Sequence, residues 1–143
     1  MLYKQIIELF EILDDSKADG AAVERYLRSI KEDADVQVYP LYGDKGKTDV
    51  VKICVHGSNG KRNGGSAPTL GVIGRLGGLG ARPERIGFVS DGDGALTVLA
   101  AAAKLLSMQE KGDQLPGDVV IVTHVCADAP TEPHEPVDFM DSP

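Results

Sequence analysis

The stretch that decides the fold is RIGFVSDGDGALTVLAAAAKLL, residues 85–106. Residues 86–90 have the apolar and β-branched side chains of a short strand. The DGDG of residues 91–94 then ends the strand, and we expect Asp93 to be the N-cap of a helix. Because the helix that follows is apolar on nearly every side, it is typical of a helix buried against a sheet.

Two amphipathic helices are expected at the N-terminus, before this stretch. In the first, the apolar residues at helical spacing are Leu2, Ile6, Leu9, Phe10 and Leu13. The turn-forming DDSKADG of residues 14–20 ends that helix, and Asp19 can cap the next one. The inward stripe of the second helix is Ala22, Val23, Tyr26, Leu27 and Ile30.

Three further segments read as strands. DVQVYPLY, residues 35–42, alternates like a strand, but Pro40 cannot donate a ladder hydrogen bond and so favours an edge position. VVKICVHG, residues 50–57, is rich in β-branched residues and indicates a more central strand. VVIVTHVCAD, residues 119–128, begins as a buried strand and is the last one.

Residues 57–85 are unusually rich in glycine. We expect a flexible loop and then a glycine-rich helix, since Ser66, Ala67 and Pro68 make a suitable N-cap and first turn. Leu70, Ile73 and Leu76 follow at helical spacing. A phosphate-binding loop is the alternative for GSNGKRNGG, residues 57–65, although this segment lacks the G-x-x-x-x-G-K-[ST] pattern.

The predicted order is helix, helix, strand, strand, helix, strand, helix, strand. This alternation favours a single α/β domain over residues 1–143, a three-layer sandwich with a mixed sheet. Residues 129–143 are rich in proline and have no periodic apolar pattern, so they read as a loop or a truncated end. In such folds ligands bind beyond the carboxyl ends of strands.

Charge and composition limit the classes of partner. The formal net charge is −7, spread along the chain without a cluster of lysine and arginine, which disfavours nucleic acid and anionic membranes as partners. Since no apolar run reaches the length of a signal peptide or a membrane span, we expect a cytoplasmic protein. Cys54 and Cys126 lie in apolar strands without C-x-x-C spacing, which favours reduced, buried thiols.

Polar side chains that could hold a metal or move a proton follow the predicted strands. His124, Cys126 and Asp128 stand at every second position where the last strand ends, and His56 and Asp91 close two other strands. We therefore expect three segments to meet at a common edge of the sheet. Simpler readings stand beside this one: hydrogen-bonded histidines at the fringe of the sheet, a turn residue at Asp91 and a buried thiol at Cys126. His134, between prolines, reads as solvated and is a weaker candidate for a late ligand.

Four stretches of the chain, taken in order, resemble the co-catalytic zinc exopeptidases. LFEILDDSKADGAAVERYLRSI is similar to their two opening helices, and DVQVYPLYGDKGKTDVVKICVHG to two strands that end in a Gly-His-x-Asp zinc motif. SDGDGALTVLAAAAKLL resembles their Asp-x-x-Gly step, and GDVVIVTHVCAD the strand that ends in paired glutamates. The sequence also resembles a family of longer bacterial and archaeal hypothetical proteins, for which the resemblance implies no settled activity.

The exopeptidase resemblance implies a set of site residues. His56 matches the first zinc ligand, Asp91 the metal-bridging carboxylate, and Asp128 falls close to the glutamates that supply the general base and a further ligand. Ser58 stands where the companion aspartate of the histidine belongs. A second departure is Cys126-Ala127, in place of a catalytic glutamate. His124 or Cys126 could substitute as ligand or catalytic group.

Three classes of function follow from these readings. The first is a metal-dependent hydrolase, with zinc as the expected ion and a small peptide or amide as substrate. The second is a non-catalytic protein that binds a ligand or partner on a degenerate exopeptidase fold. The third is a structural half-domain, because an exopeptidase-type sheet needs further strands. We therefore expect the chain to be the N-terminal part of a longer domain, to form a homo-oligomer, or to have its fold completed by a second chain.

Overall fold

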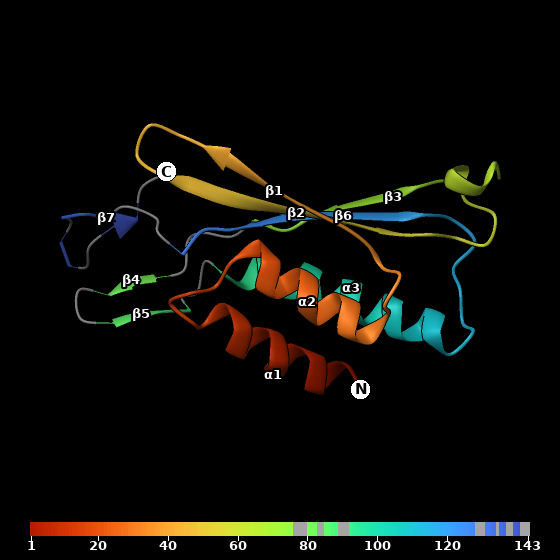
Figure 1. Ribbon diagram of the computed structural model, residues 1–143, viewed down its shortest axis with the longest axis horizontal. Coiled ribbons are helices and arrows are strands. Elements are labelled where there is room, and N and C mark those ends of the chain that lie inside the picture. The colour runs from red at the N-terminus through yellow and green to blue at the C-terminus, as the bar shows by residue number, and fades with distance from the viewer. Residues whose placement is uncertain are drawn as a thin grey trace.

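The computed structural model describes residues 1–75, 80–82, 85–88, 92–127, 131–133, 135–136 and 139–140. Its centre is a mixed four-stranded sheet in the order β1-β2-β6-β3. The strands are β1 (Asp35–Tyr42), β2 (Lys47–Val55), β3 (Leu70–Ile73) and β6 (Val119–Val125). Figure 1 shows that the three described helices lie together on one face of this sheet: α1 (Leu2–Leu13), α2 (Gly20–Ile30) and α3 (Asp93–Glu110).

The mixed α/β class expected from the sequence is confirmed. Of the three layers expected, the described residues form the sheet and one helical layer. The core lies between these two layers, where α3 packs Leu99 and Leu106 against the sheet residues Val51, Ile53 and Ile121. The nearly all-apolar helix is therefore buried against a sheet, as its composition predicts. Among the helices described, none is long and apolar enough to cross a membrane.

The two N-terminal helices form where their patterns predict them. Leu9 and Leu13 of α1 and Val23 and Leu27 of α2 are buried on the expected faces. Asp19 caps α2, because its carboxylate accepts a hydrogen bond from the amide of Ala22 at 2.7 Å.

The cap predicted for α3 is wrong by one position. Asp93 is the first residue of this helix, Gly92 holds the cap position, and the cap makes no side-chain hydrogen bond. Asp93 in the first turn still interacts favourably with the helix dipole.

Strand pairing places β1 and β3 at the two edges of the main sheet. β1 pairs antiparallel with β2, which puts Pro40 on an edge strand as expected. β2 also pairs antiparallel with β6, and β3 pairs parallel with β6. β2 and β6 are thus both central, in agreement with their β-branched sequences.

The helix expected behind Ser66–Pro68 is wrong, because its place is taken by β3. The amide of Gly74, directly after β3, donates to the carbonyl oxygen of Val122 on β6 at 3.0 Å. A Cβ on Gly74 would lie 2.3 Å from the carbonyl oxygen of Gly94 and 2.5 Å from a methyl of Val98. The glycine therefore serves the close approach of this strand to α3, and pairing with β6 overrides the helical spacing.

Two small ladders lie outside the main sheet. β4 (Gly80–Arg82) pairs antiparallel with β5 (Arg85–Gly87), so the short strand expected at residues 86–90 begins in a hairpin of its own. β7 (Thr131–Glu132) pairs with β8 (Phe139–Met140) inside the segment expected to be a loop. Figure 1 shows β4, β5 and β7 at the same end of the molecule.

Candidate metal centre

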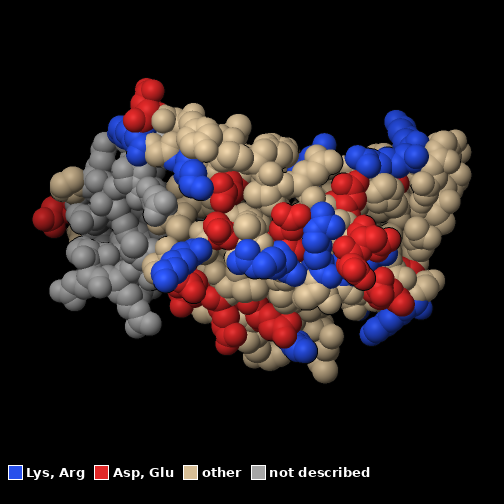
Figure 2. Space-filling model, viewed as in Figure 1, with Lys and Arg blue, Asp and Glu red and all other residues tan. Residues whose placement is uncertain are grey.

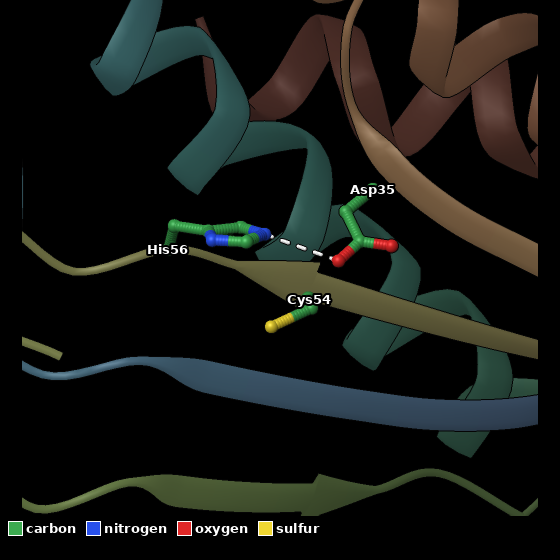
Figure 3. Close-up of side chains that lie close together, drawn as sticks. All are labelled: Asp35, Cys54 and His56. Carbon is green, nitrogen blue, oxygen red and sulfur yellow. Dashed lines mark hydrogen bonds and ion pairs between the residues drawn. The ribbon is translucent and has the colours of Figure 1, made fainter. Parts of the chain in front are cut away.

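Three side chains that can ligate a metal converge at the start of β1 and the end of β2. Asp35 is the first residue of β1 and pairs with Cys54 of β2, and His56 follows directly after β2. One donor atom of each residue lies within 4.8 Å of the others. Figure 3 shows the imidazole and the carboxylate pointing toward each other, with the sulfur of Cys54 beside them. We call these three residues the donor cluster.

The carboxylate of Asp35 is the centre of the contacts in the donor cluster. Its Oδ2 lies 3.1 Å from Nε2 of His56 and accepts a hydrogen bond from Nη1 of Arg62 at 2.7 Å. Arg62 comes from the short 3-10 helix η1 (Lys61–Asn63), which follows β2. The positive guanidinium thus balances the negative charge of the Asp35 carboxylate, and it occupies the side of the carboxylate to which a metal ion would also bind.

Burial sets the protonation state of Cys54. The residue is 4% exposed, and this burial raises the pKa of its thiol, although the nearby charge of Arg62 opposes the shift. The thiol is therefore neutral at physiological pH, which disfavours Cys54 as a free nucleophile because a nucleophilic cysteine reacts as thiolate. A bound zinc ion, in contrast, deprotonates a thiol that ligates it.

The donor cluster lines a hollow of about 430 Å³. Its other walls combine the apolar Ala34 and Leu106 with the amides of Gln109 and Gln114 and the ammonium of Lys31. A hydrogen bond from Lys31 to Asp33 raises the pKa of this lysine, which stays charged at neutral pH. A small polar molecule could therefore reach the cluster through a partly apolar opening. The molecular surface seen in Figure 2 mixes acidic and basic side chains and presents no large patch of one sign.

The glycine-rich loop after β2 uses its amides within the protein. The amides of Gly57 and Arg62 donate to the carboxylate of Asp118, at 2.9 and 3.1 Å. Those of Ser58 and Asn59 donate to backbone carbonyl oxygens of the segment before β6. Because the loop already encloses a carboxylate, the structure argues against the phosphate-binding alternative.

The expectation of one common edge is wrong for His56. β2 and β6 are antiparallel, so their carboxyl ends lie at opposite ends of the sheet. His124 pairs with Val50, six positions before His56 on the neighbouring strand, which separates the two histidines by about 20 Å. One metal ion cannot bind both.

The remaining part of that expectation agrees with the topology. β3 and β6 are parallel, so their carboxyl ends share an edge. The start of α3 lies at this edge as well, since a Cβ on Gly94 would meet the carbonyl oxygen of Arg75 at 2.3 Å. We call this the β6 edge. Asp91, Asp128 and His134 lie outside the described residues, and their roles stay predictions.

His124 and Cys126 are the two predicted site residues that the described part of the chain places at the β6 edge. Nδ1 of His124 lies 2.9 Å from Oγ1 of Thr48. Cys126 is 3% exposed, and its Sγ donates to the carbonyl oxygen of Lys47 at 3.4 Å. Both contacts fit the simpler readings of a hydrogen-bonded histidine and a buried thiol.

Asp35 was not predicted as a site residue from the sequence, and Cys54 was predicted only as a buried thiol. The signal that could have found them is the hairpin register. The turn at residues 43–46 pairs Tyr42 with Lys47, and counting outward from this pair places Asp35 opposite Cys54. His56, which was predicted as a ligand, lies two positions after Cys54.

Comparison with protein families identifies the chain. A family described as "Protein of unknown function (DUF1177)" matches residues 40–143. The chain belongs to this family. The match includes Cys54 and His56, whereas Asp35 precedes it, and it confirms the resemblance to a family without a settled activity. No curated protein matches the chain.

Solved structures of similar fold are longer than this chain. A glutaminyl cyclase from an Acidobacteriales bacterium is 12% identical with a TM-score of 0.50, and the match covers 94% of this chain and 46% of that one. The bottromycin maturation enzyme BotP in complex with Mn is 20% identical with a TM-score of 0.47, over 76% of this chain and 26% of that one. The chain thus spans less than half the length of either. The likeness to the cyclase confirms the zinc-exopeptidase-like fold class.

Proposed function

We propose that the protein is a divergent metal-dependent hydrolase of peptide or other small amide bonds, with the donor cluster as its metal centre. The observation that carries this proposal is the convergence of a carboxylate, a thiol and an imidazole within 4.8 Å at the wall of an accessible hollow. The fold class supports it, because ligands of such folds bind in crevices at the ends of strands.

The donor cluster fits zinc in the number and kind of its atoms. Catalytic zinc sites use three protein ligands, drawn from cysteine, histidine and carboxylate side chains, and keep one position open. The sulfur of Cys54 favours zinc over magnesium or manganese, which prefer oxygen ligands. Ligand bonds of about 2.0–2.3 Å correspond to donor atoms roughly 3.3–3.8 Å apart, and the donor atoms of the cluster lie within 4.8 Å of one another.

The side chains around the cluster have distinct tasks in this proposal. When bound, a divalent ion supplies Lewis acidity that polarises an amide carbonyl and lowers the pKa of water. In the metal-free protein Arg62 binds the Asp35 carboxylate, and a bound ion would displace it. The side chains of Gln109 and Gln114 belong to the wall of the hollow in which a substrate would lie. Asp128 follows the carboxyl end of β6, at the opposite end of the sheet from the donor cluster, so we propose it as general base only for the second candidate centre below.

A second candidate centre is the β6 edge, with Asp91, His124 and Asp128 as ligands and Cys126 as a catalytic group. The observation in its favour is topological: the ends of β3 and β6 and the start of α3 share that edge. The two histidines, about 20 Å apart along the sheet, allow the two centres to be tested separately.

Hydrolysis is tested with purified protein, chelated and then reloaded with zinc, against a panel of amino-acid amides and dipeptides. We expect cleavage that is lost on chelation and restored by zinc, because the ion supplies the Lewis acid. Zinc-loaded protein that cleaves none of these compounds would exclude this substrate class. The binding protein on a degenerate exopeptidase fold would then be the better reading.

Replacing Arg62 with glutamine is expected to tighten zinc binding about tenfold, because a cation is removed from the Asp35 carboxylate to which the ion would bind. Zinc titration of the purified variant measures this. The control is Arg28→Gln, which removes an equal charge from an i,i+4 pair with Glu24 on α2. Equal or weaker binding in Arg62→Gln would contradict the assignment of Asp35 as a ligand.

A further inference from the structure

The backbone of His56 and Gly57 is held by hydrogen bonds to four side chains. The carbonyl oxygen of His56 accepts hydrogen bonds from Nε2 of Gln109 at 2.7 Å and from Nε2 of Gln114 at 3.0 Å. The next residue, Gly57, donates its amide to Asp118 at 2.9 Å and accepts at its carbonyl from Nδ2 of Asn63 at 3.0 Å. Two consecutive residues are thus fixed by side chains from the end of α3, the loop after it, the residue before β6, and η1.

Asp118 is the central member of this arrangement. It is 2% exposed, and the amides of Gly57 and Arg62, in that order, hold the pKa of its carboxyl below the ordinary value. The carboxylate is therefore charged and fully able to accept at neutral pH. Gly60 permits its position, since a Cβ there would lie 2.0 Å from Oδ1 of Asp118. One carboxylate thus anchors the backbone on both sides of the loop that carries His56 and Arg62 to Asp35.

We propose that Gln109, Gln114 and Asp118 are positioning residues of the metal centre, which act through His56 and do not touch the metal. We call these three residues the His56 clamp. The inference rests on the proposed function, since the donor cluster must be the metal centre for the His56 clamp to affect it.

The physical reason is preorganisation. His56 follows the last residue of β2, so ladder hydrogen bonds no longer define its backbone. An imidazole there would sample several directions, and ordering it would oppose metal binding. The three hydrogen bonds between the His56 clamp and the backbone of His56 and Gly57 fix the backbone from which the ring projects, as supporting residues do for ligating side chains.

Two variants test the His56 clamp. Asp118→Asn keeps the shape of the side chain but places an amide group, with only one acceptor oxygen, between two amide donors. Gln109→Met removes one donor to His56 and keeps the length and helix propensity of the residue in the last turn of α3. The control is Asp113→Asn, at an exposed position in the loop between α3 and β6. Should Asp118→Asn fail to fold, Gln109→Met decides.

Each protein is measured in two ways. Cobalt titration reports affinity and, through the sulfur-to-cobalt absorption, ligation by Cys54. Nuclear Overhauser contacts from the His56 ring to the side chains of Asp35 and Cys54, recorded without metal, report whether the ring holds its direction. We expect the affinity of the variants to fall roughly 10–100-fold, as for other supporting residues, and their ring contacts to weaken, while the control matches the wild type.

The outcomes separate the two proposals. Variants that keep both the wild-type affinity and the ring contacts would overturn the His56 clamp. If the wild type binds neither cobalt nor zinc but the ring contacts disappear in the variants, the proposed function fails and the positioning of His56 by the clamp stands. Lost affinity with intact ring contacts would count against the clamp, because the effect would not pass through His56.

Discussion

Zinc binding is expected to disappear in His56→Ala and to persist in His124→Ala. His56 supplies one of three donor atoms that lie within 4.8 Å, and its loss leaves only Asp35 and Cys54. Removal of a direct ligand should cost more than the roughly 10–100-fold that loss of an outer partner costs. His124, at the other end of the sheet, contacts Thr48 and contributes nothing to this cluster.

The two histidine variants are a matched pair, because each removes one half-buried imidazole that lies in a central strand or directly after one. Zinc titration after chelation, with thermal melting of the metal-free proteins, separates loss of a ligand from loss of the fold. The opposite result, binding lost in His124→Ala and kept in His56→Ala, would move the centre to the β6 edge. Cys54→Ser should follow His56→Ala, since a hydroxyl is a much poorer zinc ligand than a thiolate.

A methyl group at Gly57 is expected to destabilise the fold by about 2–3 kcal/mol and to weaken zinc binding. A Cβ there would lie 2.4 Å from the backbone carbonyl oxygens of Pro116 and Gly117. Gly57 cannot move away easily, because its amide is hydrogen-bonded to Asp118 and its carbonyl to Asn63. The displaced segment would carry His56 away from Asp35.

Gly71→Ala is the control for this substitution. Gly71 lies in β3, and a Cβ built there meets no atom within 4 Å. We expect its free energy of unfolding to change by within about 0.5 kcal/mol. Urea unfolding of both variants, with the slopes compared, gives the two values. Similar stabilities for Gly57→Ala and Gly71→Ala would show that the loop after β2 tolerates movement, and the close packing argued for it would be wrong.

Much of the fold could be predicted because local pattern and tertiary packing agree. The stripes of α1 and α2, the cap at Asp19, the edge position of Pro40 and the apolar α3 all follow from periodicity and residue type. The prediction failed at β3, where Leu70 and Ile73 have helical spacing but the chain pairs with β6. Short segments rich in glycine have weak local preferences, so a distant partner strand decides their structure.

The site was harder to predict than the fold because it depends on strand direction. The residues alone showed that His56 closes a strand, but they did not show that β2 runs antiparallel to β6. The ends of these two strands were therefore predicted to share one edge of the sheet, although they lie at opposite ends. Asp35 is the first residue of its strand, and nothing in the alternating pattern of residues 35–42 marked it as a ligand. The Gln109 and Gln114 contacts could not be foreseen, since they bridge more than fifty positions to the backbone of His56.

The most direct test of the metal centre is a crystal structure of zinc-soaked protein with anomalous diffraction recorded at the zinc edge. We predict a single strong anomalous peak between Oδ2 of Asp35, Sγ of Cys54 and the ring of His56, with the Arg62 guanidinium turned away from the carboxylate. A strong peak at the β6 edge with nothing at the donor cluster, or no peak in a crystal soaked at saturating zinc, would contradict it.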